Sequence, residues 1–150
     1  MTGGVLVSLF LTAMFWLFVV GIGIAAFRLG GREERRVFLL LLFTVFASVA
    51  VRIAGREDFE AISLGVFIAD LVLLAVLVWV VARSPRYFPI WTMAFHLSAV
   101  LSHLARLATP DLPPVAYALG EGFWGYPVFA TILIGCAEVR LLRRMNLPIP

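Results

Sequence analysis

The sequence predicts an all-α integral membrane protein, a bundle of five transmembrane helices with its N-terminus outside and its C-terminus inside. The composition, the long uncharged runs and the distribution of arginine lead to this prediction. Of the 150 residues, 63% are hydrophobic and 14% are charged, whereas soluble domains carry about 25% charged residues. A chain of this length has too little interior to bury the apolar excess in water. We therefore expect a single transmembrane helical domain over residues 1–150.

The first apolar run, Gly4–Phe27, contains no charged residue. A helix needs about 20 apolar residues to cross the hydrocarbon of a bilayer. A secretory signal peptide would begin with a charged region and have a shorter apolar stretch, and no charged side chain precedes this run. We expect a permanent first span at about 4–27.

Four further apolar runs predict four more spans, at about 37–53, 62–82, 88–108 and 115–138. Proline marks the boundaries of these runs, as is typical of helix ends. Pro85 and Pro89 flank the gap before the fourth run, and Pro110 and Pro113 separate the fourth from the fifth. The connecting loops are too short to hold a separate domain.

The arginines set the predicted orientation. With five spans, residues 28–36, residues 83–87 and the tail after 138 share one side and carry nine of the twelve basic residues. Arg52, Arg56 and Arg106 fall on the other side. Cytoplasmic segments carry the excess of basic residues, so this distribution places the N-terminus outside, and four or six spans would scramble it.

Aromatic and basic residues also bear on location. Trp79, Tyr87 and Trp91 would lie near the inner headgroups, where such rings are favoured. The basic residues are all arginine, which is compatible with a GC-rich bacterial genome. We expect a multi-pass protein of a bacterial inner (plasma) membrane. Because the arginines follow topology and do not form a binding face, no nucleic-acid partner is expected.

Several ionisable residues fall within the predicted spans, and six of them are the candidate site residues: Arg52, Asp70, His96, His103, Arg106 and Glu121. A charged side chain at the bilayer centre costs roughly 2.5–3.5 kcal/mol on insertion scales, so each is a candidate functional residue. With about 1.5 Å of rise per residue, all six fall in the outer half of the bundle, on four helices. Their depths predict contacts of Asp70 with His96 or His103, and of Glu121 with Arg106 or Arg52.

Spacing in the fourth span predicts a buried polar face. His96 and His103 are seven residues apart, nearly two turns, and share a face with Thr92 and Ala99, with Arg106 to one side. We expect this face to point into the bundle, because lipid would leave the imidazoles unpaired.

The fifth span contains an unusual segment, residues 120–127, with three glycines and a proline. Broken helices mark binding sites in transporters, so this segment predicts local bending or unwinding. A kink sealed by neighbouring helices is the structural alternative. The stripe Glu121, Gly125, Val128 and Gly135 would allow close helix approach, and Cys136 is expected to pack as a small apolar side chain.

No cofactor is expected. His96 and His103 lie about 10 Å apart along one helix, so they cannot ligate one haem iron, and a haem would need one of them plus a partner from another chain. The same spacing is wrong for a shared metal ion. Ser102 and His103 are adjacent on a helix and point apart, and the sequence lacks the GxSxG, HExxH and phosphate-loop motifs that would name an enzyme.

The functional expectation is therefore a protein that acts by binding. We predict an accessory or sensing subunit whose polar cluster engages a small ligand or a partner helix, within the lipid bilayer and in a larger membrane-protein complex or a homo-oligomer. The alternative is a small transporter or proton-coupled carrier that uses Asp70, His96, His103 and Glu121. A third interpretation leaves the same polar pairs a purely structural role, fixing helix register.

Overall fold

The computed structural model of the chain describes residues 2–55, 64–109 and 114–148, without the side chains of residues 2–5, 8, 55 and 114–121. Within these ranges the chain forms helices α1 (Thr2–Arg28), α2 (Arg32–Gly55), α3 (Leu64–Arg83), α4 (Phe88–Ala108) and α5 (Pro114–Arg144). All five are long and apolar enough to cross a membrane. The prediction of an all-helical chain with five such helices is confirmed.

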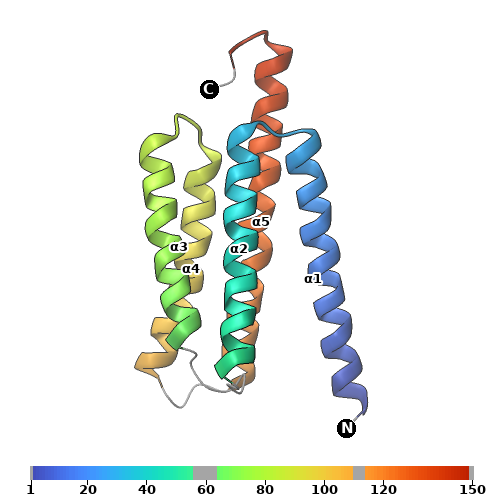
Figure 1. The fold of residues 1–150 in the computed structure, drawn as a ribbon, viewed down its shortest axis with the longest axis vertical. Helices are drawn as coiled ribbons and strands as arrows, with labels where there is room; N and C mark the ends of the chain where they lie inside the picture. The colour runs from blue at the N-terminus through green and yellow to red at the C-terminus, as the bar shows by residue number, and fades with distance from the viewer. Residues whose placement is uncertain (1, 56–63, 110–113, 149–150) are drawn as a thin grey trace.

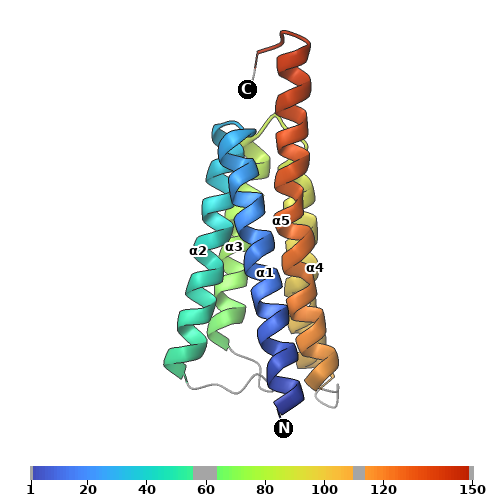
Figure 2. The same ribbon diagram turned by 90° about the vertical axis from the view of Figure 1, so that its right-hand side faces the viewer.

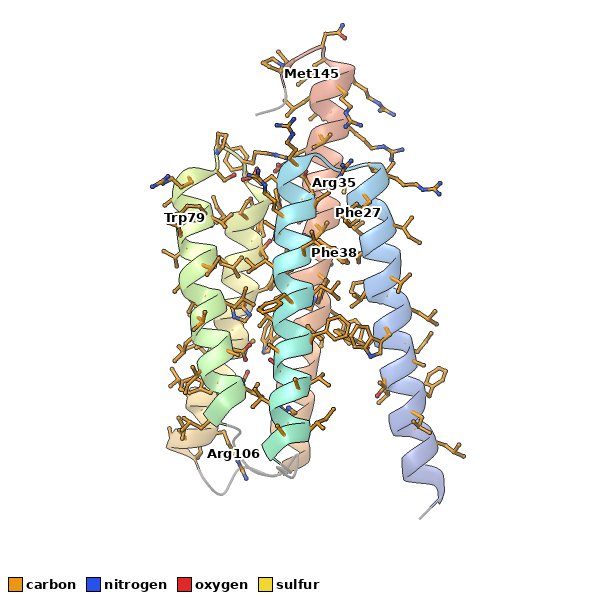
Figure 3. The ribbon with its side chains drawn as sticks, viewed as in Figure 1. Phe27, Arg35, Phe38, Trp79, Arg106 and Met145 are labelled. Carbon is orange, nitrogen blue, oxygen red and sulfur yellow. The ribbon has the colours of Figure 1, made fainter. Side chains whose placement is uncertain are left out.

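Successive helices run in opposite directions along one long axis (Figure 1). At one end of the bundle α1, α3 and α5 finish while α2 and α4 begin. We call it the arginine end, because it carries Arg28, Arg32, Arg35, Arg36, Arg83, Arg86, Arg140, Arg143 and Arg144. Figure 3 shows Arg35 and Met145 toward this end and Arg106 at the opposite end.

Helices α5 and α2 connect the rest of the bundle. Helix α5 packs against α4, α1 and α2, while α2 also packs against α3 and α1, and α3 packs against α4. Toward its N-terminus α1 leans away from α2 (Figure 1), and Figure 2 shows its course across the front of the bundle. The buried core contains residues from several helices, among them Val19, Leu41, Leu77, Phe129 and Ile132.

Helix α2 begins at Arg32, five residues before the predicted start at 37. The loop before α2 is shorter than predicted because Glu34 caps the helix. Its Oε2 accepts a hydrogen bond from the Gly31 backbone N–H at 2.6 Å. This is the return contact of a capping box, in which the third helical residue binds the N-cap amide. The turn is also tight, since a Cβ on Gly30 would lie 2.6 Å from the Ala26 carbonyl oxygen.

Helix α5 is continuous from Pro114 to Arg144 although Pro127 lies inside it. The predicted unwinding of residues 120–127 is therefore wrong, and the predicted end at 138 is six residues too early. A proline in a helix removes one backbone hydrogen bond, and packing on α4, α1 and α2 holds the helix together. At Gly125 the missing side chain admits Phe15 of α1, whose ring would lie 3.2 Å from a Cβ there.

Candidate functional site

Helix α4 turns its polar face into the bundle, as predicted. Its buried residues are Phe88, Pro89, Thr92, His96, Val100 and His103. From Pro89 onward they recur every three or four residues, which is one face of an α-helix. Ala99 is partly buried between the two histidines. The two imidazoles therefore lie among side chains of the neighbouring helices and do not face outward from the bundle.

Asp70 of α3 binds both imidazoles, and we call Asp70, His96 and His103 the histidine cluster. The Asp70 carboxylate oxygen Oδ2 lies 2.9 Å from Nε2 of His103, and the Asp70 backbone carbonyl oxygen lies 2.9 Å from Nε2 of His96. The predicted proximity of Asp70 to the histidines is confirmed. One residue of α3 thus contacts two residues that are seven positions apart on α4.

The antiparallel course of α3 and α4 explains how a single residue reaches both rings. Side chains of an α-helix tilt toward its N-terminus, whereas the backbone carbonyls point toward the C-terminus, where they accept the helical hydrogen bonds. The Asp70 side chain therefore leans toward the opposite end, where His103 lies. Its carbonyl points toward the arginine end, where His96 lies.

The histidine cluster is closely enclosed. The His103 side chain is fully buried and that of Asp70 is 16% exposed. The Phe67 ring lies 5.6 Å from the imidazole of His103. At the residue before His103, Trp124 of α5 donates its indole N–H to Ser102 Oγ at 3.1 Å, and Ser102 donates to the Ser98 carbonyl. Helices α3, α4 and α5 are thus joined by polar contacts around the two histidines.

One turn from His96, toward the arginine end, two buried threonines connect α4 with α5. The hydroxyl oxygens of Thr92 and Thr131 lie 2.6 Å apart. Thr92 also contacts the Phe88 carbonyl, and Thr131 contacts the Val128 carbonyl. Each hydroxyl has one hydrogen to donate, so two of these three hydrogen bonds form at a time. Either threonine can therefore donate the hydrogen bond that joins the two hydroxyls, so these hydrogen bonds can run in either direction along the bundle axis.

A second buried cluster lies at the arginine end, where Arg86 binds two carboxylates. We call Glu34, Arg86 and Glu138 the ionic triad. Arg86 Nη1 pairs with Glu34 Oε1, while Nη2 and Nε lie 3.1 and 3.2 Å from Glu138 Oε2. Nη2 also donates to the Gly135 carbonyl at 2.7 Å, and the guanidinium stands 5.2 Å from the Phe88 ring centroid. The side chains of Glu34 and Arg86 are 0% and 3% exposed.

Sequence reasoning missed the ionic triad. Glu34 and Arg86 lie in segments that it assigned to loops, and Arg86 counted only as a topology determinant. The signal available in the sequence was Gly135, which a stripe of small residues had marked for close helix approach. A Cβ there would lie 2.8 Å from Glu34 Oε1 and 2.9 Å from the Phe88 ring, so the glycine makes room for the triad.

The remaining predicted site residues are Arg52, Arg106 and Glu121. Arg52 and Arg106 are partly buried near the opposite end of α2 and α4, and each takes part in an interaction. The Glu121 side chain lies outside the described residues, so its pairing with either arginine stays a prediction. Within residues 2–55, 64–109 and 114–148, no group of three His, Cys, Asp or Glu side chains is placed to hold a metal ion.

Cys136 packs as expected for a small apolar residue. It is buried in the core cluster, and its Sγ lies 3.6 Å from the Ala25 carbonyl oxygen of α1.

Comparisons with protein-family models, with curated proteins and with solved structures each find no match for this chain. The functional argument therefore depends on the geometry of the two clusters.

Proposed function

We propose that this chain is a multi-pass membrane protein that acts by binding, as an accessory or sensing subunit, and that the histidine cluster is its responsive element. The ligand that the cluster fits best is the proton. The observation that carries this proposal is the engagement of both imidazoles by one aspartate. The proposed setting is a bacterial inner membrane, with the N-terminus outside and the C-terminus inside.

Several features support membrane insertion in this orientation. Large apolar side chains are exposed along all five helices, among them Leu17, Phe43, Val72, Leu101 and Leu141. Soluble monomers rarely expose apolar surface on this scale. Trp79, Tyr87 and Trp91 are exposed around the α3–α4 turn, where an aromatic belt is expected. The arginine end would then face the cytoplasm, in agreement with the positive-inside rule.

The chemistry of the histidine cluster supports a sensing role. Histidine is the side chain whose charge ordinarily changes between pH 5 and 8. A neutral His103 can donate a hydrogen bond to the Asp70 carboxylate, and a protonated one adds the attraction of an ion pair. Because this attraction is stronger inside a protein than in water, protonation tightens the connection between α3 and α4. A partner helix that packs on these helices would read this change.

The sensing role is tested by hydrogen–deuterium exchange of the protein in liposomes between pH 5 and 8. We expect the amide protection of α3 and α4, after correction for the intrinsic pH dependence of exchange, to rise as the pH is lowered, and this response to be lost in Asp70→Asn and His103→Gln. Ser98→Ala changes a partly buried residue of α4. It is the matched control and should respond to pH as the wild type does. A wild-type protein whose α3 and α4 keep the same corrected amide protection across this range would refute the sensing role.

The accessory role is tested by purification in mild detergent. We expect the chain to co-purify with a larger membrane complex or as a homo-oligomer, and Asp70→Asn to weaken this association while Ser98→Ala leaves it intact. A chain that stays monomeric in native lipid discs prepared directly from membranes would contradict this part of the proposal.

A proton-coupled carrier is the second candidate. It is favoured by the Thr92–Thr131 pair, which continues the polar face of α4 from the histidine cluster toward the arginine end. In such a carrier Asp70 and His96 relay protons. Liposomes loaded with a pH-sensitive dye separate the two candidates, because a carrier moves protons and loses this flux in Asp70→Asn and His96→Ala. A sensing subunit gives no flux.

A further inference from the structure

The outward-facing side of α3 carries an apolar hollow of about 310 Å³. Sites for small molecules are concave, mostly apolar and about 300–1,000 Å³ in volume. Val72 and Trp79 are the first and last lining residues along the helix, and both are exposed. The small Ala75 between them makes the surface dip. We call this feature the α3 hollow, and its lining residues are Val72, Ala75, Val76 and Trp79.

The α3 hollow continues along the helix to a cation. Spacings of three and four residues make one stripe on a helix surface, and this stripe runs through Val72, Val76, Trp79 and Arg83. The Arg83 guanidinium stands over the Trp79 ring, 5.3 Å from its centroid. Arg83 is exposed at the arginine end, and within the described part of the chain it forms no ion pair. The apolar stripe therefore ends in a positive charge that is open to an external anion.

The length of this stripe matches one leaflet of a bilayer. From Val72 to Arg83 it covers about 16 Å, at about 1.5 Å of rise per residue. Half of a hydrocarbon core of about 30 Å is about 15 Å. A phospholipid has its tails toward the midplane and its headgroup at the surface, and the stripe has the same polarity, with its cation at the arginine end. A tail that lies in the α3 hollow therefore brings its own headgroup to Arg83.

The Arg83 side chain favours an anionic headgroup. A guanidinium presents a planar set of donors that matches the geometry of a phosphate. Stacking on the Trp79 ring holds the plane of the guanidinium and leaves its N–H edge for the phosphate oxygens. A zwitterionic headgroup would bring an ammonium group close to the same cation, whereas an anionic headgroup brings no opposing charge.

We propose that the α3 hollow and Arg83 together bind one anionic phospholipid of the leaflet at the arginine end. One acyl tail lies along the hollow from Val72 to Trp79, and the phosphate binds Arg83. This proposal rests on the membrane insertion proposed above but not on the histidine cluster, because Asp70 of α3 faces α4. Occupancy of the α3 hollow then follows the anionic lipid content of that leaflet.

Native mass spectrometry of the full chain in detergent tests the choice of lipid. The probes are phosphatidylglycerol, which is anionic, and phosphatidylcholine, which is zwitterionic, each titrated separately. We expect phosphatidylglycerol to bind more tightly, and Arg83→Gln to weaken its binding about fivefold, as expected for the loss of one basic residue near an anionic headgroup. Arg35→Gln is the matched control and should keep the binding. Arg35 is also exposed and stands over an aromatic ring, that of Phe27, but neither residue lines the hollow.

Filling the α3 hollow tests where the lipid binds. Ala75→Leu places a large side chain where the tail would lie and should weaken the binding of phosphatidylglycerol. Ala105→Leu, at an exposed alanine of α4, is the matched control and should leave it unchanged. Chain-brominated lipids in liposomes give a second measurement, because bromine quenches a nearby tryptophan. The Trp79 signal is the fluorescence lost in Trp79→Phe, and brominated phosphatidylglycerol should quench it more than an equal fraction of brominated phosphatidylcholine.

The proposal is overturned if the two lipids bind equally, or if Arg35→Gln weakens the binding as much as Arg83→Gln, since the whole arginine end would then attract the lipid. It is also overturned if Ala75→Leu leaves the binding unchanged, or if a co-purifying partner helix keeps the brominated lipids away from Trp79. Failure of the proposed function gives different results. A chain that does not insert would show no quenching by either lipid, whereas Asp70→Asn, which removes the proposed sensing, should keep the lipid preference.

Discussion

Gly135 of α5 stands directly against Glu34 of α2, so closely that a Cβ at position 135 would lie 2.8 Å from the Glu34 carboxylate oxygen Oε1. The same Cβ would lie 2.9 Å from two atoms of the Phe88 ring. Both neighbours are fully buried, and Glu34 is held by Arg86 and by the Gly31 amide. Neither can move aside freely, so the ionic triad requires a glycine here.

Gly135→Ala should therefore destabilise the protein although alanine favours helix formation. Overpacking of a well-packed site costs about 1–3 kcal/mol. We expect a loss of this size in the free energy of unfolding, measured by denaturant titration in detergent micelles. Gly122→Ala is the matched control on the same helix, because a Cβ there meets nothing within 4 Å. Equal stability of the two variants would show that the close approach of α5 and α2 is not tight in solution.

Arg86→Gln should be the most damaging single change at the arginine end. Removing one partner of a buried ion pair leaves the other charge uncompensated and costs about 3–5 kcal/mol. Arg83→Gln, three residues earlier in the chain and exposed, provides the control, and its free energy of unfolding should stay close to that of the wild type. Similar losses from both variants would mean that Arg86 contributes only as a surface charge.

The fold was largely predictable because long apolar runs give a clear helix signal. A helix able to cross a bilayer must be long and apolar, and the fourth predicted span coincides with α4 at both ends, Phe88 and Ala108. Errors occurred where the apolar runs give way to charged residues, at the start of α2 and the end of α5. There the helix is stabilised by a side-chain cap at Glu34 and by continued helical bonds through Arg144, and neither requires apolar residues.

The two polar clusters differed in predictability for a related reason. His96 and His103 stand out because they interrupt an apolar run, and helical spacing alone places both on one face. Glu34 and Arg86 stand among other charged residues near helix ends, where their own residue types do not distinguish a buried charge from a solvated one. Only the packing of Gly135 against Glu34 and Phe88 encloses them.

The threonine pair should behave as a coupled unit. In Thr92→Val, Thr131 keeps its hydrogen bond to the Val128 carbonyl, and in Thr131→Val, Thr92 keeps its bond to the Phe88 carbonyl. Each single change loses one interhelical hydrogen bond, worth about 0.6 kcal/mol on average in a membrane protein. A double-mutant cycle on the free energy of unfolding should give a coupling energy of this order. A coupling energy of zero would indicate that the two hydroxyls do not share a hydrogen.

Asp70→Asn should affect the two histidines differently, because they bind different atoms of the aspartate. The substitution replaces the carboxylate that contacts His103 but keeps the backbone carbonyl that contacts His96. The chain contains only these two histidines, so ring-¹⁵N labelling gives one set of imidazole signals for each. We expect a large change in the Nε2 signal of His103 and little change in that of His96.

His103→Gln assigns the two sets of signals, since it removes one of them. Ser98→Ala serves again as the control, because its hydroxyl bonds within α4 to the Ala94 carbonyl and touches neither ring, so neither Nε2 signal should move. If Asp70→Asn moved both Nε2 signals equally, the substitution would have rearranged α3 as a whole. The asymmetric result, by contrast, follows only if α3 offers its side chain to one imidazole and its backbone carbonyl to the other.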